Sequence, residues 1–387
     1  MSLIKQAKTE NENAPRYNAN IIFKGNMKIL LVITGLGIGG AERLVTNLAD
    51  RYASLGHEVV LAYFQGKVDL KPSDERVQLV NLNFTRTIIG VIRGAYNLRE
   101  IIKDFKPDVI NSHMVHPNFV CRLLRLVTPI NRLVSSAHSP DEGGGIRIPI
   151  YRYTDKLADI STNVSEAAVE SMVKLNAVKK GRMVNIYNGV DTKLFFSDNN
   201  IRIKTRKTLN IPDHERVILA VGRLWEQKDY PNLFEAISLL NNVNPPLILI
   251  SGDGPLRSEL ENYVKKLNIS EKVIFLGFRH DISELMNACD IFVLPSAWES
   301  FGLVVAEAMS AECVVVATDC GGVKEVLGEE GLLVPPRNPP KLAKALETAL
   351  AYSLDESKKI GKKKKKRVVD LYSIENTANE YLNIYRA

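Results

Sequence analysis

Short apolar segments alternate with amphipathic stretches along most of the chain. The first series contains KILLVIT, EVVLAYF, VQLVNLN, DVINSH, RLVSSAH, DISTNVS and MVNIYNG, and the second contains RVILAVGRL, LILISGDGP, VIFLGF, DIFVLPS, CVVVATD and GLLVPP. Apolar runs of this length between helical stretches are typical of parallel sheets that are covered by helices on both faces. The pattern therefore predicts an α/β protein with two tandem Rossmann-like, doubly wound parallel-sheet domains.

The same pattern divides the chain into segments. Residues 1–26 are polar and aperiodic, so we expect a flexible leader there, with Met27 as a candidate start of the native protein. We predict a first domain over residues 27–195, a second over 196–370, and a C-terminal helix over 371–387 that packs back on the first domain. Because parallel sheets bind ligands at the carboxyl ends of their strands, the domains should face each other across a cleft that holds the site.

Composition narrows the class of protein. The 387 residues are 45% apolar and 25% charged, as in ordinary globular proteins. No apolar run reaches the roughly 18 residues of a membrane span, and the first residues lack the apolar stretch of a signal peptide, so we expect a cytoplasmic protein. Wide cysteine spacing disfavours a zinc site and structural disulfides. The cysteines are Cys121, Cys289, Cys313 and Cys320.

Positive charge is concentrated in the first half of the chain. The first 195 residues carry 26 Lys and Arg against 18 Asp and Glu, whereas the remainder carries 25 against 26. Such an excess is compatible with nucleic acid, an anionic membrane surface, an acidic ligand or simply solubilising charge.

Two segments make the membrane alternative concrete. Residues 358–367 contain eight basic residues in ten, which fits either a solvated helix face or an anionic membrane surface. Nucleic acid is disfavoured, because no aromatic residues are interleaved with this run. The stretch TIIGVIRGAYNLREII is amphipathic and could lie in the membrane interface. The basic residues on or beside it are Arg86, Arg93, Arg99, Lys103 and Lys106.

A glycine-rich turn follows the first predicted strand. Gly35, Gly37 and Gly40 fit the pattern G-x-G-x-x-G, and glycines between a strand and a helix let backbone N–H groups approach a phosphate. A dinucleotide-binding domain would also need an acidic residue at the end of the second strand. The only acidic residue of that strand, Glu58, stands at its beginning, so a nicotinamide cofactor is disfavoured.

A second group of candidate residues lies in the second domain. Glu299 and Glu307 stand eight residues apart, and Ser300 to Leu303 are predicted to begin a helix between them. Amide groups at a helix N-terminus can bind a diphosphate, and carboxylates beside it can bind sugar hydroxyls. Arg223 and Lys228 follow the first strand of this domain, where two cations can neutralise a diphosphate. Each residue alone would be compatible with an ordinary solvated charge.

The chain resembles the retaining family-4 glycosyltransferases (group 1 glycosyl transferases) with the GT-B fold. The motifs that carry the resemblance are GIGGAER, YNGVD, GRLWEQK, GDGP, LPSAWESFGLVVAEAM and DCGGVKE. The resemblance implies metal-independent transfer of a sugar from a nucleotide-sugar donor to an acceptor hydroxyl, with no cofactor. It further implies an acceptor-binding first domain, a nucleotide-sugar-binding second domain, and a lipid-linked glycan acceptor in surface polysaccharide or lipopolysaccharide biosynthesis. The enzyme would then work in the cytoplasm, peripherally at the inner face of the membrane.

The resemblance also implies roles for individual residues. Arg223 and Lys228 would hold the donor diphosphate, Glu299 the hydroxyls of the donor sugar, and Glu307 the ribose. The backbone N–H groups that complete the phosphate site would be those of Phe301, Gly302 and Leu303, and Gly39 and Gly40 would approach the phosphate from the first domain. These residues and His138 constitute the predicted donor and catalytic site.

Three histidines and one tyrosine leave alternatives open. His138 matches a family histidine near the reacting centre, but it could equally cap a strand. His113 and His116 lack a nearby acidic residue, so we expect an acceptor-side or structural role and no metal. Tyr187 stands where the family often has proline, which suggests a less rigid linker.

Two other functions and one mechanism complete the expectations. A sugar-nucleotide epimerase of similar fold and a non-catalytic protein that binds nucleotide sugars remain alternatives. For a transferase we expect attack by the acceptor hydroxyl on the same face as the leaving group, with the leaving phosphate as base, since we can assign no carboxylate nucleophile.

Overall fold

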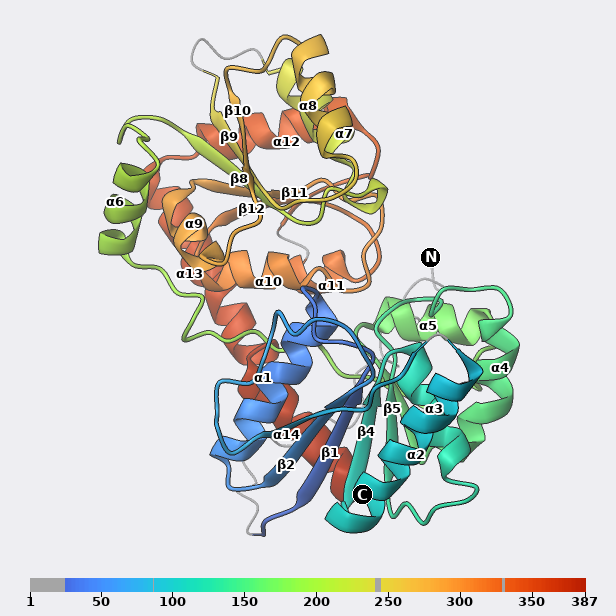
Figure 1. The fold of residues 1–387 in the computed structure, drawn as a ribbon. Helices are drawn as coiled ribbons and strands as arrows, with labels where there is room; N and C mark the ends of the chain where they lie inside the picture. Colours follow the sequence, from blue (N-terminus) through green and yellow to red (C-terminus); the bar gives the residue numbers. More distant parts are fainter. Residues whose placement is uncertain (1–24, 86, 241–244, 329–330) are drawn as a thin grey trace, which may run out of the picture.

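Two lobes, each built around one parallel sheet, make up the structure (Figure 1). The computed structural model describes residues 25–85, 87–240, 245–328 and 331–387. Most of the expected leader and Arg86 therefore lie outside the described residues. In the described part of the chain, no helix is long and apolar enough to cross a membrane.

The first lobe contains a sheet with the strand order β3-β2-β1-β4-β5-β6-β7. Its strands are β1 (Lys28–Ile33), β2 (Glu58–Tyr63), β3 (Gln78–Asn81), β4 (Val109–His113), β5 (Leu133–Ser136), β6 (Ile160–Asn163) and β7 (Met183–Asn185). Its helices are α1 (Gly40–Ser54), α2 (Ile88–Phe105), α3 (Val115–Leu124), α4 (Arg147–Thr154) and α5 (Glu166–Lys174).

The second lobe contains a sheet with the order β10-β9-β8-β11-β12-β13. Its strands are β8 (Val217–Val221), β9 (Leu247–Ser251), β10 (Val273–Gly277), β11 (Ile291–Leu294), β12 (Val314–Thr318) and β13 (Leu332–Val334). The helices that follow β7 along the chain are α6 (Asn199–Thr208), α7 (Tyr230–Ser238), α8 (Arg257–Lys266), α9 (Ile282–Ala288), α10 (Leu303–Ser310), α11 (Val323–Leu327), α12 (Pro339–Ala351), α13 (Leu354–Leu371) and α14 (Ile374–Arg386).

Both sheets are parallel and buried on both faces, which confirms the predicted fold class. In β1, Leu31 pairs with Leu61 of β2 on one side and with Asn111 of β4 on the other. Leu30 belongs to the cluster that packs beneath α2 and α3, whereas Leu31 belongs to the cluster beneath α1 and α14. Successive side chains of such a strand pack into cores on opposite faces of the sheet, so almost every position is apolar. This explains the continuous apolar run in KILLVI.

The C-terminal helix α14 returns to the first lobe, beside α1 (Figure 1). The Tyr385 hydroxyl accepts a hydrogen bond of 2.7 Å from Asn111 Nδ2, and Arg132 donates to Ile384 O at 2.7 Å. Ile374 and Tyr381 join the apolar core around β1. The last helix of the chain is thus an integral layer of the first lobe.

The chain crosses between the lobes twice, and the two crossings are bonded to each other. Val190 N donates to Tyr372 O at 2.8 Å, and Ile374 N donates to Val190 O at 2.9 Å. The Tyr187 ring packs edge-on against Tyr372, with centroids 5.1 Å apart, and lies 5.9 Å from the ring of Phe301. Tyr187, which stands where the family often has proline, is thus packed between Phe301 and Tyr372. The less rigid linker stays a prediction.

The basic run at residues 358–367 lies in α13 and is only partly a solvated surface. Lys364 is buried and donates to Leu327 O at 2.8 Å, while Arg367 donates to Glu325 O at 2.7 Å. Lys365 forms an ion pair of 2.9 Å with Glu312. The expectation of one uniform solvated or membrane-facing surface is therefore wrong for these three residues, which attach α13 to the second lobe.

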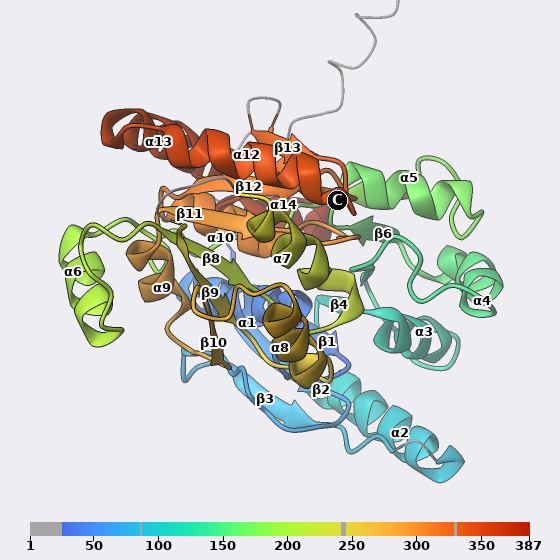
Figure 2. The same ribbon diagram turned by 90° about the horizontal axis from the view of Figure 1, so that it is seen from above.

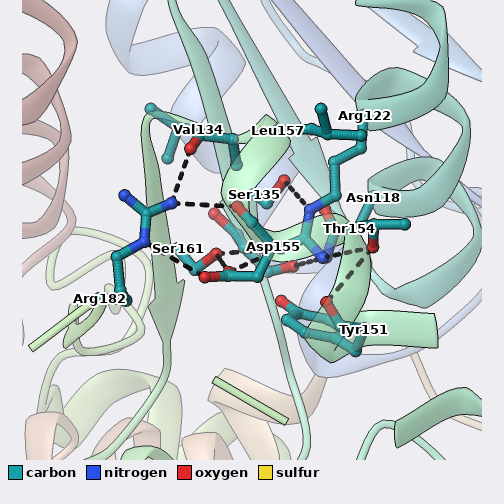
Figure 3. A network of polar contacts seen from close by, with 12 residues as sticks. Asn118, Arg122, Val134, Ser135, Tyr151, Thr154, Asp155, Leu157, Ser161 and Arg182 are labelled. Carbon is teal, nitrogen blue, oxygen red and sulfur yellow. Dashed lines mark hydrogen bonds and ion pairs between the residues drawn. The ribbon is translucent and has the colours of Figure 1, made fainter. Parts of the chain in front are cut away.

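A buried arginine ties together several elements of the first lobe (Figure 3). The Arg122 side chain on α3 is fully buried; it donates to Ser135 Oγ at 3.1 Å and to Ser161 Oγ at 3.0 Å. It also pairs with Asp155 at 3.3 Å and lies 4.1 Å from the centroid of the Tyr151 ring. Because every side of this buried charge has a partner, the cluster joins α3 and α4 to β5 and β6.

Candidate active site

The strand orders place the candidate residues at equivalent points of the two sheets. Connections reverse direction between β1 and β4 in the first sheet and between β8 and β11 in the second, and such reversal points are where open parallel sheets bind ligands. The glycine turn follows β1, Arg223 and Lys228 follow β8, and Glu299 follows β11. The fold therefore brings residues far apart in sequence to one cleft.

Lys228 and Glu299 form the closest contact of the site. Lys228 Nζ lies 2.5 Å from Glu299 Oε1, and Ser296 Oγ donates to the same oxygen at 2.8 Å. Both charged side chains are largely buried, with exposed fractions of 16% for Lys228 and 9% for Glu299. The pair is thus held in a fixed geometry before any ligand binds, and Ser296 is a supporting residue that the sequence analysis missed.

Arg223 is exposed and has no ion-pair partner among the described carboxylates. Its guanidinium lies over the Trp225 ring, 5.3 Å from the centroid. The positive charge of Arg223 also acts on Glu42 of the first lobe. Burial raises the pKa of Glu42, and the charge of Arg223 partly offsets that shift. Arg223 is therefore a cation at the cleft that can accept an anionic ligand.

Glu307 is a buried carboxyl group on α10 that faces the first lobe. Burial raises its pKa to about 7, and Arg43 of α1, whose Nε lies 3.9 Å from Glu307 Oε1, works in the opposite direction. Arg43 is the last residue of the motif GIGGAER. The sequence analysis used this motif but assigned no role to Arg43. The two lobes thus contribute opposite charges to the same part of the cleft.

The helix α10 begins later than the sequence suggested. Gly302 precedes its first residue, Leu303, and has a φ of +82°, a left-handed conformation that favours glycine. Ser300 and Phe301 therefore lie before the helix, which corrects the expectation of a helix from Ser300. The Phe301 ring is buried against Tyr187 between the lobes, while the free N–H groups of the first turn start at Leu303.

The glycine turn of the first lobe faces this helix end. A Cβ atom built on Gly40 would lie 3.9 Å from Leu303 Cδ2, so the Leu303 side chain reaches the glycine turn of the other lobe. Gly39 is the N-cap residue of α1, in an extended conformation. The N-termini of α1 and α10 consequently point toward the same space.

The motif DCGGVKE packs against the loop that carries Glu299. Gly321 has a φ of +53°, and a Cβ atom there would lie only 1.7 Å from Glu299 O, so the turn can pack against the Glu299 loop only because residue 321 is glycine. Glu325 of the same motif reaches across to the other lobe, where its carboxylate accepts hydrogen bonds of 2.9 Å from the N–H groups of Glu166 and Ala167 at the start of α5. Neither role could be read from the motif.

His138 lies at the other edge of the cleft, after β5. Its Nε2 lies 3.1 Å from Nδ1 of His113, and its backbone N–H donates to Glu142 Oε1 at 2.9 Å. Burial lowers the pKa of His138 to about 4. His113 is fully buried, whereas His116 lies exposed on α3, and the described residues contain no cluster of ligands able to hold a metal ion.

Comparison with known proteins places the chain in a family. Residues 38–194 match the family described as Glycosyltransferase Family 4, and residues 201–367 match glycosyl transferases group 1. An uncharacterized glycosyltransferase of Methanocaldococcus jannaschii is 30% identical over 379 residues, which cover 90% of this chain and 94% of the relative. The chain belongs to the family-4, group 1 glycosyltransferases.

Two further similarities extend the comparison. A Campylobacter jejuni enzyme named N-acetylgalactosamine-N,N'-diacetylbacillosaminyl-diphospho-undecaprenol 4-alpha-N-acetylgalactosaminyltransferase is 27% identical over 92% of this chain and 99% of its own length. The structure of Anabaena HepE in complex with UDP-glucose has a TM-score of 0.79 at 22% identity, covering 92% of this chain and 98% of that chain. The structural similarity confirms the GT-B fold. As a family-4 glycosyltransferase, the protein transfers a sugar from a nucleotide donor, and the family retains anomeric configuration.

The buried Glu307 predicts a pH dependence of stability. Its pKa rises from 4.5 to about 7 on folding, so the stability it contributes in the protonated form is complete below about pH 4.5 and is lost as the pH rises through 7. Glu307→Gln should therefore reduce the fall in stability between pH 5 and pH 8, by up to about 3 kcal/mol. Thermal melting of both proteins at the two pH values measures this.

The control for this experiment is Glu259→Gln. Glu259 lies exposed on α8, so its substitution should leave the pH dependence of the wild-type protein unchanged. Identical pH dependence of wild type and Glu307→Gln would contradict the burial of an ionisable Glu307.

Proposed function

We propose that the protein is a metal-independent hexosyl- or N-acetylhexosaminyltransferase that uses a uridine diphosphate sugar and a lipid-linked glycan acceptor in surface polysaccharide or lipopolysaccharide assembly. The observation that carries the proposal is the largely buried ion pair of Lys228 with Glu299, which stands just before α10, together with the exposed Arg223 on the same loop as Lys228. The Anabaena protein, which has the same fold, binds UDP-glucose, and the Campylobacter relative acts on an undecaprenol-linked glycan. Both similarities support the choice of donor and acceptor.

The diphosphate of the donor has a site of matching charge. Arg223 is an exposed cation that forms no ion pair with a described carboxylate, and Lys228 stands five residues later on the same loop. The N–H groups of the first turn of α10, with those of Gly302 and Phe301 just before it, offer further donors to an anion, and the glycine turn with Gly39 and Gly40 allows close approach from the other lobe.

The two carboxylates suit the two sugars of the donor. Glu307, buried beside Arg43, can accept hydrogen bonds from the ribose hydroxyls, which favour its ionised form and compensate for its burial. Glu299 can accept hydrogen bonds from the hydroxyls of the donor sugar. Because Lys228 and Ser296 already hold one of its oxygens, Glu299 is placed for binding and not for nucleophilic attack.

The chemical step then needs no enzyme nucleophile. The bond between the anomeric carbon and the phosphate oxygen breaks, and the acceptor oxygen bonds to the same face of the anomeric carbon. The acceptor proton passes to the departing phosphate oxygen. Arg223, Lys228 and the amide groups of α10 stabilise the negative charge of the leaving diphosphate, which in a water-poor cleft accounts for several kcal/mol of barrier lowering.

Removal of the two cations tests the proposal. Arg223→Ala/Lys228→Ala should reduce UDP release in the presence of donor and lipid-diphosphate acceptor by at least about a hundredfold, because the leaving charge loses its stabilisation. The matched control is Lys265→Ala/Lys266→Ala, which removes two exposed cations from α8 of the same lobe and should leave the rate unchanged. Wild-type turnover by the first variant, or UDP release that does not need an acceptor, would contradict the proposal.

We further propose that the first lobe docks on an anionic membrane through α2, which Figure 2 shows at the outer edge of the molecule. The buried face of α2 is formed by small and apolar residues at helical spacing, beginning with Gly90 and Gly94. Outside that face, Ile88, Ile89 and Ile92 are 81%, 71% and 64% exposed. A helix with an exposed apolar end and basic residues around it suits the membrane interface.

The basic residues of α2 contribute unequally. Lys103 and Arg99 both contact Glu100, at 2.9 Å and 3.5 Å, so part of their charge is neutralised within the helix. Arg93 and Lys106 are exposed and carry no ion pair with a described carboxylate. The apolar residues should therefore matter at least as much as the charge.

Liposome flotation tests the membrane surface. Ile89→Ser/Ile92→Ser should reduce the fraction that floats with vesicles containing anionic lipid, because each buried isoleucine side chain contributes roughly 2 kcal/mol. Ile203→Ser on α6, which replaces an isoleucine of the other lobe that is 54% exposed, is the control and should float like the wild type. Equal flotation of all three proteins, or none by the wild type, would contradict docking through α2.

A further inference from the structure

The adjacent strands β4 and β5 end in a pair of histidines. His113 is the last residue of β4 and pairs in register with Ser136 of β5, and His138 follows two residues later. Nδ1 of His113 and Nε2 of His138 lie 3.1 Å apart, so one nitrogen donates and the other accepts. His113 is 0% exposed, whereas His138 is partly exposed. The pair therefore connects the interior of the first lobe with the cleft.

Burial favours the neutral form of both rings. Burial lowers the pKa of His113 well below its ordinary value and that of His138 to about 4, and the neighbouring His138 ring further disfavours a charge on His113. A neutral imidazole carries a single N–H, which leaves two arrangements of protons for the pair. The choice between them determines what His138 can offer a substrate.

The surroundings of the other ring nitrogen of His113, Nε2, indicate which of the two proton arrangements is present. This nitrogen is buried and has no hydrogen-bond partner among the described residues. It lies near the ring of Tyr381, whose centroid is 6.1 Å from that of His113. A buried N–H group without a partner is rarer and costlier than an acceptor with none, so Nε2 is the unprotonated nitrogen. The proton of His113 then lies on Nδ1 and is donated to His138.

We propose that His113 is a positioning residue that holds His138 as the Nδ1–H tautomer, so that His138 offers a neutral hydrogen-bond donor to a sugar hydroxyl or to the oxygen that leaves. The inference rests on the proposed function and on the family resemblance, which implies that His138 lies near the reacting centre. With Nε2 occupied by His113 and Nδ1 protonated, His138 has no free lone pair. It therefore cannot take the acceptor proton, which agrees with the leaving phosphate as base.

The C-terminal helix covers His113. The hydroxyl of Tyr381 lies 3.3 Å from Ser136 Oγ and 3.4 Å from Thr162 Oγ1, and its ring packs edge-on against His113. The orphan nitrogen of His113 thus lies beneath α14, not in solvent. This enclosure fixes the tautomer, because water could otherwise bind either ring nitrogen.

The tautomers can be measured directly on the full-length protein. Histidine labelled with ¹⁵N in the ring distinguishes the two neutral forms by NMR, and His113→Asn and His138→Asn assign the signals. We expect protonated Nδ1 and unprotonated Nε2 in both rings. A protonated Nε2 in either ring would overturn the proposal. Because this readout needs no substrate, it decides the inference even if the proposed activity is not found.

Kinetics provide the second test. His113→Leu fills the space but cannot donate; it should lower kcat about tenfold while the KM for the donor changes less than about twofold. His113→Asn keeps an N–H donor and should restore kcat to within about threefold of the wild type. His214→Leu, which replaces an exposed histidine between α6 and β8 of the second lobe, is the control and should leave both constants unchanged.

The outcomes separate positioning from mere packing. If His113→Asn is as slow as His113→Leu although both variants melt like the wild type, His113 does not act through its N–H group and the proposal is wrong. Wild-type kcat in His113→Leu would overturn it as well. Absence of transfer by the wild-type enzyme would instead refute the proposed function, and the NMR result would still stand.

Discussion

The backbone pairing of Val190 with the Tyr372–Ile374 segment is the constraint on which the arrangement of the molecule depends. The two hydrogen bonds, of 2.8 and 2.9 Å, join the two places where the chain passes between the lobes. Because α14 is then anchored in the first lobe through Tyr381 and Tyr385, the second lobe is held at both of its ends. Two parallel sheets fixed in this way present the carboxyl ends of their strands to one cleft.

Burial sets the electrostatics of this cleft. Removal from water raises the pKa of Glu307 and lowers those of His113 and His138, so the unliganded site holds few charges without partners. Lys228 and Glu299 neutralise each other, and Arg223 remains as the exposed cation. In the proposed reaction, the donor diphosphate would meet preorganised donors, which need little rearrangement when negative charge develops on the leaving group.

The sequence was sufficient to predict the strands, the two sheets and the loops that carry the candidate residues, because fully buried strands and glycine turns leave strong local patterns. Residues that act across long sequence distances were missed. Ser296, Arg43 and Glu325 look like ordinary polar residues until the fold places them beside Glu299, Glu307 and the start of α5. Likewise, the packing of Tyr187 against Phe301 and Tyr372 could not be predicted, because both partners are distant along the chain.

The central claim is that the cleft binds a nucleoside diphosphate through the second lobe, and nucleotide binding measures this most directly. A ligand that binds only the folded protein raises its melting temperature in proportion to the logarithm of its concentration above Kd. Melting of the wild-type protein in UDP, GDP, ADP and CMP should show a clear rise with UDP and smaller rises with the others. The absence of any rise at millimolar concentrations of all four nucleotides would contradict the account.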